Sequence, residues 1–224
     1  MKTLAIYGSG GLGREILLLA TKCLSVQTSQ KIEQIVWIDD IRLETEYLGY
    51  KCFPFEDFIN HCGPSETQIV CAVGEIEDRI LLRNRIENYG YRLATLVADN
   101  AIDSDDSIFE EGVVVFPNCI LTSKIHLHKN VLVRTGVTLT HDDIIGENSV
   151  ISHKATIAGS IAIGTNCYIG LGALIRDHVT IGTNCVIGMG AVVTKSAPAP
   201  LLSQDVQQLR FEIPTLKAYL TTKY

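Results

Sequence analysis

The chain has 224 residues, of which 46% are hydrophobic and 20% are charged, as in an ordinary globular protein of one or two domains. Its formal net charge is −6 and its Lys and Arg residues are not clustered, which argues against nucleic acid as a partner. No stretch approaches the roughly 20 apolar residues of a membrane span, and the opening residues do not read as a signal peptide. We therefore expect a cytoplasmic protein that does not bind membranes.

The seven cysteines contain no CxxC pair, and their odd number favours reduced thiols over a disulfide framework. Cys167 and Cys185 lie 18 residues apart, and we interpret them as small core residues stacked on each other.

Residues 1–98 alternate β-prone runs with helical patterns, which predicts a small parallel α/β domain. The expected strands cover 3–7, 34–38, 68–73 and 93–98, and the expected helices follow Gly13 and cover 55–62 and 76–89. Gly8, Gly10 and Gly13 form a GxGxxG loop after the first strand, a pattern that lets backbone amides and a helix N-terminus approach a pyrophosphate.

Two acidic residues, Asp39 and Asp40, follow the second strand. There a carboxylate could accept hydrogen bonds from a ribose or a base. The alternative is a loop that only caps the end of the strand. The third strand closes on Gly74.

The organising feature of the chain is a repeat of five 18-residue segments between Phe109 and Pro198. Columns one, seven and thirteen of this repeat are aliphatic or aromatic throughout: Phe109, Leu127, Ile145, Ile163 and Ile181; Val115, Val133, Ile151, Ile169 and Ile187; Leu121, Leu139, Ile157, Ile175 and Val193. Each segment is three hexapeptides that form one triangular coil, and stacked coils bury these columns as a parallel β-helix.

Glycine and asparagine at positions two and four of several coils are expected to mark corners, because both tolerate left-handed backbone angles. These residues are Gly146, Asn148, Gly164, Asn166, Gly182 and Asn184. We assign 99–198 to the β-helix, with an acidic boundary at 99–107 and a first coil that could begin near Ile102. Residues 199–224 form a tail, which could be partly helical over 206–224 with an interruption at Pro214.

Functional residues should interrupt the apolar columns. His141, Asp142 and Asp143 come together at one predicted corner, and Gly159 lies one coil above His141. His141 suits a general base, and the bare amide of Gly159 could donate to an oxyanion. Asp142 could orient the imidazole. Asp143 falls in an inward column, so either it is the true partner of His141 or Ile144 takes the inward place.

Other histidines have plainer explanations. His153 and Lys154 replace a pair that contains glycine in later coils, Leu171-Gly172 and Met189-Gly190, and could face a second ligand. We interpret His126, His128 and His178 as solvated corner residues.

Over residues 1 to about 196 the chain resembles the PglD/NeuD-type sugar acyltransferases, which belong to the left-handed β-helix hexapeptide class. The shared motifs are GSGGLGRE after strand one, WIDD after strand two, AVG near Val73, the hexapeptide coils, and a His-acid pair followed by IG, here HDDIIG. The resemblance implies a Rossmann-like domain that holds a nucleotide-linked amino or dideoxyamino sugar, followed by a left-handed parallel β-helix.

The resemblance also implies an activity, which is acetyl-CoA-dependent N-acyl transfer for surface glycan synthesis by a homotrimer whose active site lies between subunits. His141 would be the general base for direct attack on the thioester, supported by Asp142 and the Gly159 amide, and no metal is required. The implied sugar-nucleotide contacts are Gly8, Gly10, Gly11, Gly13, Asp39, Asp40 and Gly74. The implied acyl-CoA contacts are Val150, His153, Gly159, Leu171, Ala173, Met189 and Lys195.

The chain departs from the family at three places. Val150 stands where relatives commonly have a histidine near the thioester, His153-Lys154 replaces a small residue and glycine, and Ser196-Ala197-Pro198-Ala199 replaces the usual closing loop. Two other functions stay open on the sequence, namely O-acetylation of a sugar such as a sialic acid, and a non-catalytic trimeric scaffold that binds a nucleotide. An NAD-dependent oxidoreductase would leave the β-helix unexplained.

Overall fold

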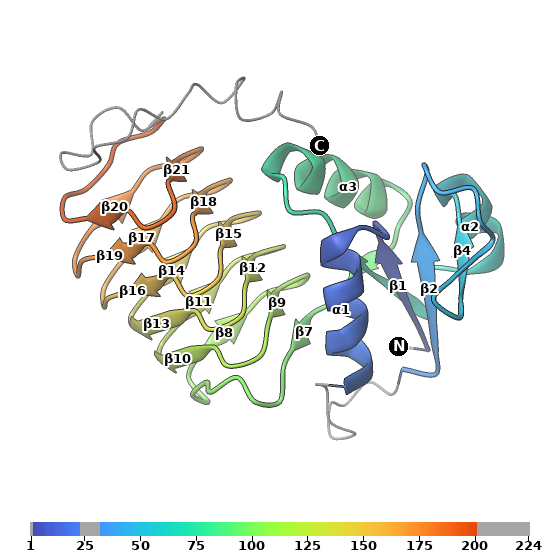
Figure 1. Cartoon of the computed structure of the whole chain (residues 1–224), viewed down its shortest axis with the longest axis horizontal. Helices are drawn as coiled ribbons and strands as arrows, with labels where there is room; N and C mark the ends of the chain where they lie inside the picture. The colour runs from blue at the N-terminus through green and yellow to red at the C-terminus, as the bar shows by residue number, and fades with distance from the viewer. Residues whose placement is uncertain (1, 23–31, 201–224) are drawn as a thin grey trace.

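The computed structural model describes residues 2–22 and 32–200, so the predicted C-terminal helix lies outside the described residues. An N-terminal α/β domain packs against one side of a β-helix, whose coils stack along the molecule (Figure 1). Within the described ranges, no helix is long and apolar enough to cross a membrane.

The N-terminal domain is built on a six-stranded sheet with the order β3-β4-β2-β1-β5-β6. All its pairs are parallel except the β3-β4 hairpin. The strands are β1 (Thr3–Tyr7), β2 (Gln34–Ile38), β3 (Glu46–Tyr47), β4 (Tyr50–Phe53), β5 (Thr67–Cys71) and β6 (Arg92–Leu93), and the helices are α1 (Gly11–Lys22), α2 (Phe55–His61) and α3 (Ile76–Asn88). Every residue of β1 is buried, as expected for the central strand of a sheet with two covered faces.

The predicted strand at 93–98 is divided between the two domains. Its first part belongs to β6, whereas β7 (Leu96–Val97) pairs in parallel with β9 (Val114–Val115) of the β-helix. The β-helix therefore begins at Leu96, ahead of the start expected near Ile102. Ile102 itself bridges Ile120 in the parallel sense, in keeping with the 18-residue spacing.

The β-helix has three parallel sheets, and each strand residue pairs with the residue 18 positions further along the chain, on the next coil. One sheet contains β7, β9, β12 (Leu132–Val133), β15 (Val150–Ile151), β18 (Tyr168–Ile169) and β21 (Val186–Ile187). The second contains β8 (Ile108–Phe109), β11 (His126–Leu127), β14 (Ile144–Ile145), β17 (Ala162–Ile163) and β20 (Thr180–Ile181), and the third contains β10 (Ile120–Ser123), β13 (Thr138–His141), β16 (Thr156–Ile157), β19 (Leu174–Ile175) and β22 (Val192–Val193). This is the left-handed β-helix that the repeat indicates.

The interior of the β-helix is the predicted set of apolar columns. Leu127, Val133 and Leu139 are fully buried, and so are Cys167 and Cys185. Burial raises the pKa of the Cys167 thiol to about 11, so this thiol stays protonated and inert in the core.

A residue with a left-handed backbone angle occurs every six residues and marks each corner of the β-helix. These residues are Gly112, Asn118, Lys124, Asn130, Gly136, Asp142, Asn148, Lys154, Ser160, Asn166, Gly172, His178, Asn184 and Gly190. The corner prediction is confirmed for asparagine at position four and is wrong for glycine at position two. A Cβ on Gly146 would lie 2.5 Å from the backbone of Gly164, so glycine is needed there for close stacking of coils.

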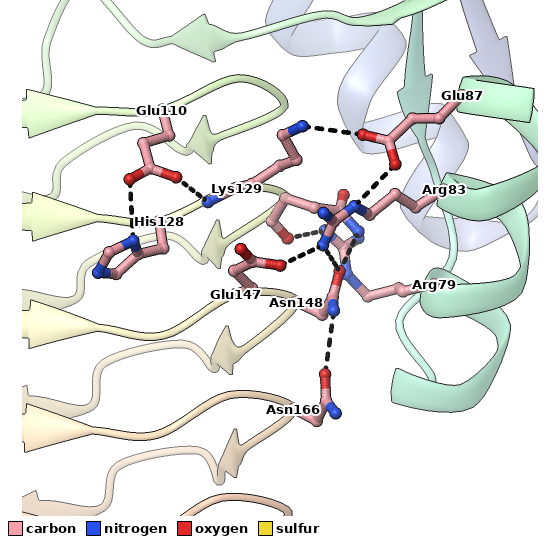
Figure 2. A network of polar contacts seen from close by, with 10 residues as sticks. Arg79, Arg83, Glu87, Glu110, His128, Lys129, Glu147, Asn148 and Asn166 are labelled. Atoms are coloured by element: carbon pink, nitrogen blue, oxygen red, sulfur yellow. Dashed lines mark hydrogen bonds and ion pairs between the residues drawn. The ribbon is translucent and has the colours of Figure 1, made fainter.

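The two domains are joined by an apolar cluster and by a polar network. Val114, Leu132 and Val150 of the β-helix pack with residues of the N-terminal domain. The fully buried Arg79 of α3 donates hydrogen bonds to Asn130 O at 2.6 Å and to Asn130 Oδ1 at 2.9 Å (Figure 2). Asn130 in turn begins a ladder of side-chain amide bonds through Asn148, Asn166 and Asn184.

Further ion pairs connect helices of the N-terminal domain to two corners of the β-helix. Arg83 pairs with Glu147 at 2.7 Å, and Arg134 pairs with Glu15 of α1. The N-terminal domain thus covers the face formed by β9, β12 and β15 and both edges of that face. The third corner, where β13 ends at His141, lies away from it.

Candidate functional site

The GxGxxG loop lies where β1 ends, at the carboxyl edge of the parallel sheet. β1 is flanked there by β2 and β5, and such a crevice is the usual ligand position in open α/β sheets. Gly8 has a φ of +110°, and a Cβ on it would lie 2.9 Å from Ala72 O. A Cβ on Gly13 would lie 2.0 Å from Gly8 O. The fold itself therefore requires these two glycines.

Three other predicted contacts, Gly10, Gly11 and Gly74, are not required by packing. A Cβ on any of them would meet no heavy atom within 4 Å. Gly10 and Gly11 stand at the N-terminus of α1, whose first amides point out of the helix. The open space beside these glycines is the part of the loop that a ligand could approach.

Asp39 is held by the glycine loop and by its own turn. Its Oδ2 accepts from Ser9 N at 2.9 Å and from Ser9 Oγ at 2.5 Å, and its Oδ1 accepts from Ile41 N and Arg42 N, both at 3.0 Å. Burial opposes ionisation, but these hydrogen bonds outweigh it and lower the pKa of the carboxyl.

Asp40 is bonded to the protein in a similar way. Its Oδ2 accepts from Tyr7 Oη at 2.5 Å and from Arg85 Nη1 at 2.8 Å, and its Oδ1 accepts from Phe55 N at 2.9 Å. Both carboxylates therefore make the contacts of a loop that holds strand ends together, which is the alternative considered from the sequence.

At the opposite side of the β-helix, His141 ends β13 and Asp142 forms the following corner with a φ of 59°. His141 Nδ1 lies 2.9 Å from Asp142 Oδ2. Because an ionised carboxylate only accepts, Nδ1 carries the proton and Nε2 keeps its lone pair. The His141 side chain is 60% exposed, so this lone pair is accessible.

Gly159 provides the space in which the imidazole lies. A Cβ on Gly159 would be 2.4 Å from both Nε2 and Cε1 of His141. Throughout residues 2–22 and 32–200, no protein group accepts a hydrogen bond from the Gly159 amide, whereas Ser160 N donates to His141 O at 2.7 Å. The corner thus combines an oriented imidazole with a backbone N–H that has no acceptor among the described residues.

The structure places Asp143 in the inward position. It is fully buried, and its carboxylate accepts from Thr140 N and Ile161 N, both at 3.0 Å. Burial raises its pKa to about 7 despite these two bonds. Ile144 is outward and 45% exposed, so the partner of His141 is Asp142.

The predicted acyl-CoA contacts are not brought together within one chain. Val150 is buried between the domains and Ala173 is buried in the β-helix core, so neither side chain is available to a ligand, which corrects both predictions. His153 lies 3.2 Å from Arg134 Nη2, and burial together with Arg134 lowers its pKa. Leu171 and Met189 are exposed in the repeat column of His153, whereas the exposed Lys195 occupies the column of His141 and Gly159.

One cluster was missed in the sequence. His126 and His128 are not free corner residues, because both contact Glu110. The signal was the His-x-His spacing on one strand with an acidic residue one full coil before it. These three are also the group that could hold a metal ion within the described part of the chain.

Comparison with known proteins now adds to this geometry. The PglD N-terminal domain model matches residues 3–86, and the hexapeptide repeat of succinyl-transferase matches residues 160–195. The acetyltransferase domain of PglB from Neisseria gonorrhoeae FA1090 is 27% identical, with a TM-score of 0.80 over 89% of this chain and 94% of that one. Both matches and this likeness are those expected of a PglD/NeuD-type sugar acyltransferase. The chain is a hexapeptide-repeat acyltransferase.

Two other structures are similar to this acyltransferase. WeeI from Acinetobacter baumannii AYE is 27% identical, covers 90% of this chain and 95% of its own, and has a TM-score of 0.65. PerB from Caulobacter crescentus, in complex with CoA and GDP-perosamine, is 21% identical and covers 88% and 91%, with a TM-score of 0.75. At 21% identity, the likeness to PerB is evidence for the fold alone.

Proposed function

We propose that the chain transfers an acyl group, with acetyl as the first candidate, from acyl-CoA to the amine of a nucleotide-linked amino sugar. The observation that carries this proposal is the corner at His141, where a base oriented by Asp142 lies against the free amide of Gly159. The acyl donor is supported by a second structure of the PglB acetyltransferase domain, 28% identical, which is in complex with acetyl coenzyme A. The acceptor class is supported by GDP-perosamine in the PerB complex.

In this mechanism, the sugar amine attacks the thioester carbonyl carbon while His141 Nε2 takes a proton from the amine. The Gly159 amide donates to the oxyanion of the tetrahedral intermediate. The C–S bond then breaks, the amide product forms, and the CoA thiolate receives the proton from the imidazolium. Asp142 keeps Nδ1 protonated and the ring oriented throughout.

We also propose that the active site is completed by a second copy of the chain in a homotrimer. The glycine loop and His141 lie on different sides of the β-helix, because the N-terminal domain covers the face opposite the His141 corner. The two faces that meet at this corner carry exposed aliphatic residues, among them Ile120, Leu174, Val192, Ile108 and Ile144. Such columns suit packing of one β-helix against another. Sedimentation should give three chains per particle, and a monomer at micromolar concentration would contradict this assembly.

The deciding experiment measures CoA release from acetyl-CoA with UDP-, GDP- and dTDP-linked amino sugars, and in parallel with a sialic acid. N-acylation predicts turnover only with an amino sugar nucleotide and an amide in the product. Turnover with the sialic acid and an ester in the product would instead establish the O-acetyltransferase. If both ligands raise the melting temperature but no product forms, the chain is the non-catalytic scaffold.

A further inference from the structure

We propose that Glu110, His126 and His128 form a binding site for a divalent cation of the zinc class. His126 Nε2 lies 2.9 Å from Glu110 Oε1, and His128 Nδ1 lies 2.8 Å from the same oxygen. The ligand atoms of the three residues all lie within 4.8 Å of one another. Figure 2 shows Glu110 and His128 pointing toward each other from neighbouring coils of the β-helix.

The repeat explains why these side chains converge. His126 and His128 flank the buried Leu127, so both point outward from the same strand. Glu110 precedes His128 by 18 residues and therefore lies one coil away in the same column. Coils three to five have Gly146, Gly164 and Gly182 in that column, so this triad occurs once in the β-helix.

The donor set is that of a zinc ion. Zinc binds imidazole nitrogen and carboxylate oxygen at about 2.0–2.2 Å, in tetrahedral geometry with ligand atoms about 3.4 Å apart. The two histidine–carboxylate contacts are shorter than this, so binding requires the ligand atoms to separate by about half an ångström. The ion takes the place of the two ring protons that lie between the imidazoles and Glu110, and each neutral imidazole then carries its proton on the ring nitrogen that does not bind the ion. A water can fill the fourth position.

The surroundings hold the ligands in place. Lys129 N donates to Glu110 Oε2 at 3.0 Å, which fixes the carboxylate while Oε1 faces the imidazoles. The Lys129 ammonium is directed at Glu87 of α3, at 3.0 Å, and so does not fill the space between the ligands (Figure 2). The imidazole rings are stacked with centroids 4.0 Å apart, and both histidines are about one-third exposed. In the single chain, the ligands are therefore partly buried yet reachable from solvent.

The experiment titrates chelator-treated full-length protein with zinc chloride and with cobalt chloride. We expect one ion per chain by calorimetry, a rise in melting temperature with zinc, and visible cobalt bands typical of low coordination. Glu110→Gln and His128→Gln should each weaken binding by about tenfold or more. Glu110→Gln retains side-chain size and an acceptor oxygen for Lys129 N, so circular dichroism should show an unchanged fold.

The matched control is His178→Gln. His178 also lies on the β-helix beside a carboxylate, with Asp177 Oδ2 at 3.8 Å. Among the described residues, no third ligand atom completes a metal-binding group with these two. Its replacement should leave the zinc affinity and the stoichiometry unchanged. Wild-type protein that binds no zinc below millimolar concentration would overturn the proposal, and so would a Glu110→Gln protein that binds zinc as tightly as wild type.

Discussion

The two candidate sites of this acyltransferase differ in how their polar side chains are used. At the carboxyl edge of the N-terminal sheet, Asp39 and Asp40 are already bonded to backbone and side-chain donors of the protein. At the His141 corner, the imidazole has one hydrogen-bond partner among the described residues, Asp142, and an exposed lone pair. A ligand of the first site must therefore rely largely on backbone amides and open space, whereas the second site offers a reactive side chain. Four substitutions would break or sharpen this contrast.

The largest effect is expected for His141→Ala. Removing a positioned general base should lower kcat by about 10²- to 10⁴-fold, with a folded assembly and near-normal affinity for both substrates. Steady-state kinetics with both substrates test this. His178→Ala serves as the control, and an unchanged kcat for His141→Ala would mean that the base lies elsewhere.

The next largest effect is expected for Gly159→Ala. The new methyl group would occupy the place of the imidazole, 2.4 Å from Nε2, so His141 must leave its position. We expect kcat to fall by about tenfold to 10²-fold. A double-mutant cycle distinguishes displacement of the base from general damage, since Gly159→Ala should cost much less in a His141→Ala background. Fully additive losses would show that the two residues act independently.

Gly10→Val tests the other side of the comparison. Gly10 borders open space, so valine should leave the fold intact but obstruct the phosphates of a sugar nucleotide. We expect at least about tenfold weaker sugar-nucleotide binding by calorimetry, with acyl-CoA affinity unchanged. Gly63→Val is the matched control, because Gly63 also borders open space but lies away from the loop. Equal loss of both ligands in Gly10→Val would indicate misfolding instead.

The smallest effect is expected for Asp143→Asn, which should change how the melting temperature depends on pH. The folded-state pKa of Asp143, about 7, is raised above the unfolded value, so its contribution to stability is present at low pH and is lost as pH rises through 7. The melting temperature of wild type relative to Asp143→Asn should fall by a few degrees, on the order of 4 °C, between pH 5 and pH 8. A constant difference over this range would mean that Asp143 does not titrate there.

The sequence predicted the β-helix well, because its determinants recur at fixed spacing. Each inward Val, Ile or Leu is explained by its own column, and the asparagine corners follow from local backbone preference. The sequence could not decide whether Asp142 or Asp143 pairs with His141, since the answer depends on the backbone angle at one corner. The role of the glycines at position two was also mispredicted, because it depends on how closely the next coil stacks and not on the local backbone angle.

The contacts between domains could not be predicted. Arg79 and Asn130 are 51 residues apart, and nothing in the pattern of α3 distinguishes this buried arginine from the exposed charges around it. The bonds of Asp39 to Ser9 likewise join segments 30 residues apart. Val150 was expected to contact acyl-CoA because relatives commonly have a histidine near the thioester at that position, but in this chain the N-terminal domain covers that face.

The position of His141 away from the N-terminal domain of its own chain has a consequence in genetic terms. If each catalytic centre takes its glycine loop from one copy and its histidine from another, two differently damaged alleles can restore each other. Cells that express both Gly10→Val and His141→Ala chains would assemble some mixed particles in which an intact loop faces an intact histidine. Neither allele alone could do so, and an excess of either one would dilute those particles, so the phenotype would depend on the ratio of the two gene products.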